Sequence, residues 1–129
     1  MPRLRLVEIE TKTQGQLTLR DVIMVTLRSG VEEQRRVLPA PRRHERGIPW
    51  EGIRTIVVPP RSEFLRGTEV GDLLAPLKVT TRGTGREQVF LVDAGPGRKE
   101  LLLRGLNADG IEVSIDLLDC LSLRVISRP

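Results

Sequence analysis

The feature that most constrains the fold of this chain is an alternation of apolar and polar residues with a period of two. Such alternation places apolar side chains on one face of a β-strand and polar side chains on the other. The pattern recurs in nine segments bounded by Gly, Pro or Asp: 4–11, 16–21, 22–29, 53–58, 77–82, 87–93, 99–106, 111–117 and 122–127. We therefore predict an all-β protein, built as a barrel or a sandwich.

Turns and a single short helix complete this prediction. Glycine tolerates positive φ, as do Asn and Asp to a lesser degree, so three short segments are predicted as hairpin turns: GTG (83–85), AGPG (94–97) and NADG (107–110). Helical spacing is confined to residues 61–76. Within that segment Thr68 is expected to cap a short helix over 69–74, which Pro76 ends.

The two halves of the chain share a layout. Residues 6–21 and 77–93 each contain a strand, a glycine-bearing turn and a second strand that ends in aspartate. Each half then closes with a tight turn and a β-branched strand, at 48–60 and 113–126. This repetition favours tandem five-stranded SH3-like barrels, with domains at 1–60 and 77–129 and a linker containing the short helix at 61–76. A single β-sandwich, which needs no repeat, is the alternative.

Positive charge is concentrated in the first half. Residues 1–66 have a net charge of +5, whereas residues 67–129 have −1. The segment QRRVLPAPRRHERG (34–47) contains five of the arginines: Arg35, Arg36, Arg42, Arg43 and Arg46. Arginine binds phosphate with two parallel hydrogen bonds, so these residues are predicted to contact a nucleic-acid backbone. The competing interpretation is a solvated loop whose arginines are balanced by neighbouring glutamates.

Aromatic residues, on which single-stranded nucleic acids usually stack their bases, are scarce. The chain has one Trp, two Phe and no Tyr. Trp50 is the candidate for stacking a base at a loop tip. Its alternative role, more common for a lone Trp, is to plug one end of a barrel.

Two segments of the first half resemble the Sm-like (Hfq/LSm-type) family. QGQLTLRDVIMVTLR is similar to its first motif, with Asp21 and Met24 at the motif positions, and WEGIRTIVVPPR is similar to the closing motif of its bacterial members. The resemblance covers about residues 4–60 and extends to 67–127 only through the repeat. It implies bent five-stranded barrels, rings formed by pairing strand edges, and RNA binding. The chain departs from the family at Val25, Glu51 and Gly52, where the family has polar or basic residues.

No set of residues predicts an enzyme, a metal site or a cofactor. His44 has no second His or Cys at ligand spacing, and Cys120 lies among leucines like a small buried hydrophobe. Asp116 and Asp119 flank a tight turn, where carboxylates commonly accept turn N–H groups. The Gly-x-Gly of RGTGRE (82–87) joins two strands and reads as a hairpin rather than a phosphate loop.

The expected location is the cytoplasm. One cysteine excludes an intramolecular disulfide and fits a reducing compartment. No apolar run approaches the roughly 18 residues of a membrane span, and the N-terminus lacks the apolar region of a secretory signal.

These observations predict a non-enzymatic RNA-binding protein that also associates with itself through strand edges. The alternative is an oligomeric adaptor, which would bind an acidic protein surface or pair with a protein through its strand edges. A minor alternative is a receptor for cyclic dinucleotides, because Arg42-x-x-x-Arg46 is similar to the first half of the PilZ motif. The second half of that motif would be DAGPGR (93–98), where Gly95 and Arg98 replace the Ser and Gly of the family.

Overall fold

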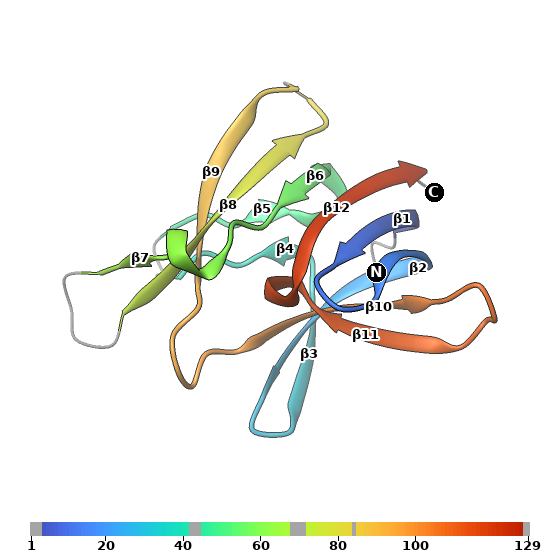
Figure 1. Ribbon diagram of the computed structural model, residues 1–129, viewed down its shortest axis with the longest axis horizontal. Coiled ribbons are helices and arrows are strands. Elements are labelled where there is room, and N and C mark those ends of the chain that lie inside the picture. The colour runs from blue at the N-terminus through green and yellow to red at the C-terminus, as the bar shows by residue number, and fades with distance from the viewer. Residues whose placement is uncertain (1–3, 42–44, 68–71, 84, 128–129) are drawn as a thin grey trace.

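The protein was examined as a computed structural model, which describes residues 4–41, 45–67, 72–83 and 85–127 (Figure 1). Its described residues form strands and three short 3₁₀ turns, with no α-helix among them. The all-β class is therefore confirmed. In the same described ranges, no helix has the length and apolar character needed to cross a membrane.

The elements are named by their order in the chain. The strands are β1 (Leu4–Thr11), β2 (Gly15–Arg28), β3 (Val31–Arg35), β4 (Val37–Leu38), β5 (Ile48–Pro49), β6 (Ile53–Val57), β7 (Leu65–Arg66), β8 (Leu73–Thr81), β9 (Glu87–Asp93), β10 (Glu100–Leu106), β11 (Glu112–Asp116) and β12 (Cys120–Ser127). The 3₁₀ turns are η1 (Trp50–Gly52), η2 (Arg61–Glu63) and η3 (Leu117–Asp119).

Strands from both halves of the chain alternate in one antiparallel sheet. Its order is β11-β10-β2-β1-β12-β6-β8-β7, with β3 added to β2 and β9 to β8, while β4 and β5 form a separate small ladder. The first and last strands, β1 and β12, pair with each other, and β2 pairs with β10 (Figure 1). Two tandem barrels are thus not confirmed, because the edges of β1 and β2 are covered by strands of the second half.

The larger of two hydrophobic clusters among the described residues, the main core, joins these strands. It contains residues from both ends of the sheet, including Leu103 of β10 and Leu77 of β8, so the sheet must curve around it. Register irregularities in the β1–β12, β2–β10 and β6–β8 ladders let the sheet bend around this core. The largest fully buried side chain is Trp50.

The predicted strands are largely confirmed, with two corrections. The segments predicted at 16–21 and 22–29 form one strand, β2, in which Asp21 has a positive φ of 53°. The helix predicted over 69–74 is wrong at its C-terminal end, because Leu73 and Leu74 begin β8 and pair with β7 and β9. Its residues 68–71 lie outside the described part of the chain.

A hairpin that the pattern did not predict shapes the start of the arginine-rich segment. Ser29 and Gly30 have φ values of 52° and 78°, as a two-residue turn between antiparallel strands requires. This turn directs residues 31–35 back along β2 as β3. Arg35 therefore belongs to a strand rather than to a loop.

The outer face of β2 carries a second, smaller apolar cluster, formed by Ile23, Val25 and Leu102. Arg104, opposite Ile23 in the ladder, donates from Nη1 and Nη2 to the two carboxylate oxygens of Glu32 at 2.9 and 2.7 Å. Its Nε donates to the Ser114 hydroxyl at 2.9 Å. These hydrogen bonds lower the pKa of Glu32 and raise that of Arg104.

Candidate functional site

Arg35 is the predicted phosphate contact that the structure describes most fully. Its Nε donates to the Thr26 hydroxyl at 3.1 Å, and its Nη2 lies 3.1 Å from a carboxylate oxygen of Glu33. The Arg35 side chain is 31% exposed. Arg35 is thus oriented by β2 while part of its guanidinium remains available to a ligand.

The other predicted site residues separate into three groups. Arg36 and Arg46 have exposed side chains. The backbone carbonyl of Arg36 accepts a hydrogen bond from the backbone N–H of Trp50 at 2.8 Å. Arg42 and Arg43 lie outside the described residues, as does His44. The Trp50 side chain has no exposed surface, and its Nε1 has no partner among the described residues. A fully buried ring cannot stack a base at a loop tip, so its burial favours the alternative role as a core plug.

A hollow of about 480 Å³, which we name the basic hollow, opens directly beside the arginine-rich segment. Cationic side chains from three separate parts of the chain line it: Arg28, Arg35, Arg98 and Lys99. Apolar residues form another part of the wall: Pro39, Ala40, Pro41, Val92 and Leu101. Thr26, Asp93 and Gly97 complete the lining. Charged groups beside an apolar wall are the usual composition of a small-ligand site.

A second hollow of about 290 Å³ adjoins the first. The two share Thr26, Arg28 and Lys99, and the second continues along the β2–β3 hairpin to Ser29, Val31 and Glu33. Arg28 and Lys99 therefore lie where the hollows meet. Both of these residues are exposed.

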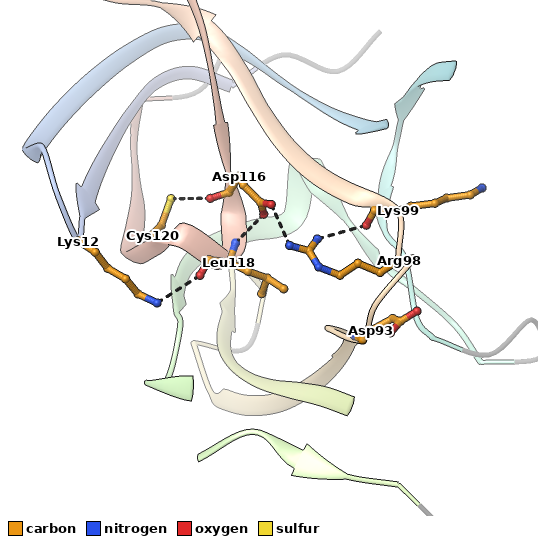
Figure 2. A network of polar contacts seen from close by, with 8 residues as sticks. Lys12, Asp93, Arg98, Lys99, Asp116, Leu118 and Cys120 are labelled. Atoms are coloured by element: carbon orange, nitrogen blue, oxygen red, sulfur yellow. Dashed lines mark hydrogen bonds and ion pairs between the residues drawn. The ribbon is translucent and has the colours of Figure 1, made fainter. Parts of the chain in front are cut away.

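The turn between β9 and β10 positions two of the cations. Asp93 Oδ1 accepts a hydrogen bond from the Gly95 N–H at 2.9 Å, and Gly97 has a φ of 75°, which favours glycine. Arg98 then donates from Nη2 to Asp116 Oδ2 at 2.8 Å, and Lys99 points away from this pair (Figure 2). The turn thus presents one anchored cation and one free to reach a ligand.

The Arg98–Asp116 pair continues into the interior (Figure 2). The two side chains are only 16% and 15% exposed. Asp116 also caps η3, because its Oδ1 accepts from the Leu118 N–H at 3.0 Å, as predicted for a carboxylate beside a tight turn. This double use of one carboxylate ties Arg98, in the wall of the basic hollow, to η3.

Cys120 lies at the inner end of this network. Its Sγ lies 3.4 Å from the Asp116 carbonyl, and its side chain is fully buried. Burial, followed by the charges of Asp116 and Asp119, raises the pKa of the thiol to about 12. A thiol in this state is a poor nucleophile, which agrees with its prediction as a core residue. The described residues also contain no cluster of metal-ligating side chains.

Of the four cations at the basic hollow, the sequence predicted only Arg35 as a site residue and missed Arg28, Arg98 and Lys99. Arg28 and Lys99 were each assigned to a strand end, and nothing in the local pattern brings them together. The Pro39–Pro41 segment lies in the wall of the hollow. Comparison of this chain with protein families, curated proteins and solved structures finds no match.

Proposed function

We propose that this protein is a non-enzymatic nucleic-acid-binding protein that holds single-stranded RNA by its phosphates. The observation that supports this most is the convergence of Arg28, Arg35, Arg98 and Lys99 on the basic hollow. The hollow adjoins Pro41, which precedes the arginines at 42, 43 and 46. Arg28, Arg35, Arg98 and Lys99 together form a cationic surface that attracts a polyanion.

The charges of the hollow favour phosphate contacts over recognition of bases. Arg28 and Lys99 are exposed and lie at the junction of the two hollows. Phosphate contacts position a strand without specifying its sequence. Since Trp50 is buried, we expect weak sequence preference and affinity that falls steeply with salt.

Titration of labelled single-stranded RNA at two salt concentrations tests this proposal. The double variant Arg28→Ala/Lys99→Ala should bind at least about tenfold more weakly, and the slope of log K against log salt should fall by about 1.4 for two lost phosphate contacts. Arg54→Ala/Lys78→Ala is the matched control, since it removes two exposed cations outside the hollow. RNA binding too weak to detect at low salt, or an equal loss in both double variants, would contradict the proposal.

The arginine-rich segment is tested separately by changing Arg35, Arg36, Arg42, Arg43 and Arg46 to Ala. We expect a further loss of affinity with the same salt dependence per contact. Unchanged affinity would remove Arg35 and the rest of the arginine-rich segment from the RNA-binding site. The resemblance to Sm-like proteins implies the same function and stays a prediction.

A cyclic dinucleotide is the second candidate ligand, because of one specific observation. Pro41, which precedes Arg42 of the PilZ-like first half in the sequence, lines the basic hollow together with Asp93 and Arg98 of the segment that departs from the second half of the motif at Gly95 and Arg98. A labelled cyclic dinucleotide should then bind more tightly than RNA of equal charge, and Arg98→Ala should weaken it. Equal or weaker binding than RNA would remove this candidate.

Self-association through strand edges is proposed alongside RNA binding. In the described part of the chain, β9 pairs with β8 and β11 with β10, and neither has a strand on its other edge. Open edges favour pairing with another chain. A measured mass of 14.5 kDa by size exclusion with light scattering would contradict self-association.

A further inference from the structure

We infer that the basic hollow is a subsite for one nucleotide unit, with the phosphate between Arg28 and Lys99 and the nucleoside against the Pro39–Pro41 wall. This inference specifies which unit of the ligand the hollow binds. It rests on the proposed function when that nucleotide is part of a bound RNA strand. It follows from the different composition of the two sides of the hollow.

The cationic side is where the two hollows meet. Arg28 and Lys99 line both hollows and are exposed, whereas Arg98 is held by Asp116 at 2.8 Å. A phosphate at the junction can therefore be approached by two cations whose charges are not already committed to a buried ion pair. The larger hollow then extends from this point toward Pro39, Ala40 and Pro41, which the smaller hollow lacks.

The apolar side suits a nucleoside. Pro39 and Pro41 are half-buried, and Val92 and Leu101 are 1% and 4% exposed beneath them. A proline ring offers a flat apolar surface without a backbone N–H, so a sugar or base can lie against it without leaving a donor unpaired. The volume of about 480 Å³ falls in the range of roughly 300–1,000 Å³ found for small-ligand sites.

The lining of the basic hollow also contains a buried hydroxyl group, that of Thr26. Thr26 is 2% exposed and lines both hollows, and its Oγ1 accepts the hydrogen bond from Arg35 Nε. Because this bond uses a lone pair, the hydroxyl keeps its own proton as a donor. Thr26, Arg28, Arg35 and Lys99 thus all present donors, which matches a ligand rich in acceptor oxygens such as a nucleoside monophosphate.

The test compares adenosine 5′-monophosphate with inorganic phosphate, using backbone amide chemical shifts in the ¹⁵N-labelled full chain and competition against labelled RNA. The monophosphate should shift the amides of Thr26, Ala40 and Gly97, and inorganic phosphate should shift those near Lys99 without moving Ala40. Ala40→Leu, which narrows the hollow without changing charge, should weaken the monophosphate and RNA at least about fivefold and leave the salt slope unchanged. Ala108→Leu, in the exposed turn 107–110, is the matched control.

Thr26→Val provides a second variant, which removes the donor while preserving shape, and should weaken the monophosphate by a similar factor. Thermal unfolding of each variant verifies that it is folded. If RNA binds with its salt dependence intact while Ala40→Leu and Thr26→Val bind as the wild type does, the subsite is wrong and the proposed function stands. If the monophosphate moves Thr26, Ala40 and Gly97 but RNA does not bind at low salt, the subsite holds a free nucleotide and the proposed function fails.

Discussion

The two faces of β2 use arginine in opposite ways. On the outer face, all three guanidinium nitrogens of Arg104 donate hydrogen bonds to Glu32 and Ser114. This face also carries the smaller apolar cluster of Ile23, Val25 and Leu102. On the inner face, Arg35 is oriented by Thr26 and Glu33 but remains 31% exposed at the mouth of the basic hollow. An arginine with every nitrogen engaged stabilises the fold, whereas one that is held but incompletely paired remains able to bind a ligand.

The same contrast shows what charge counts along the sequence leave out. Arg104 and Glu32 are 72 residues apart in sequence and cancel each other through a bidentate pair. Arg28 and Lys99 come from similarly distant segments and meet at the hollow, and neither forms an ion pair with a carboxylate of the described residues. The net charge of a segment therefore says less than whether each cation finds a carboxylate.

The largest expected effect comes from disturbing the inner, core-facing side of the sheet, where β10 packs against β2. A Cβ at Gly105 would lie 2.8 Å from the Arg20 carbonyl oxygen and 2.9 Å from Val22 Cγ2, so Gly105→Ala should lower the free energy of unfolding by about 2 kcal/mol. Gly52→Ala is the control, because a Cβ there meets nothing within 4 Å. Urea unfolding of both variants measures the difference. Equal stabilities would show that β10 and β2 do not pack as closely as described.

The next largest effect should separate the two arginines directly. Arg35→Ala should weaken RNA binding about tenfold, or about 1.4 kcal/mol, with little loss of stability. Arg104→Ala should leave RNA affinity unchanged and cost about 1 kcal/mol of stability, since it uncovers Ile23 and Val25. The same RNA titration and urea curves are run on both. If the two variants had the same RNA affinity and the same stability, the proposed difference between Arg35 and Arg104 would be wrong.

A smaller effect tests whether Cys120, in the core behind the hollow, is shielded from water. The pKa of Cys120 is raised from 9.0 to about 12, so the thiol ionises more readily in the unfolded chain. Its contribution to stability is complete below pH 9.0 and is lost as pH rises toward 12. At pH 10 the wild type should lose about 1 kcal/mol relative to Cys120→Ala. Parallel stability curves for the two proteins above pH 9 would contradict the burial.

The smallest effect concerns the two neighbouring glutamates of β3. Glu33→Gln removes the ion-pair partner of Arg35 and should raise RNA affinity about twofold. Glu32→Gln should leave affinity unchanged and lower stability slightly at neutral pH. Since Arg104 lowers the pKa of Glu32, this stability difference should be present above pH 4.5 and close as pH falls through the lowered pKa. RNA affinity that rises equally in both variants would mean that neither glutamate is specific to the hollow.

The sequence predicted most of the strands correctly, but it did not predict which strands pair with one another. The strands β1 and β9 have the predicted bounds, and Cys120 is buried as expected. The helix over 69–74 failed at Leu73 and Leu74, because apolar residues at helical spacing also suit a strand that packs on the core. β3 was missed because its residues are mostly exposed, and an exposed strand has no apolar alternation to find.

The sequence by itself determined that this protein is all-β and where most of its strands and turns lie. Alternation, glycine turns and the capping carboxylate of Asp116 act over a few residues, so they can be read without knowing the rest of the chain. Only the tertiary structure decided that β1 lies against β12 and β2 against β10. That pairing brings Arg28, Lys99 and the Pro39–Pro41 wall to one hollow. Strand edges accept many partners equally well, and the choice among them is made by the shared core, which no local pattern encodes.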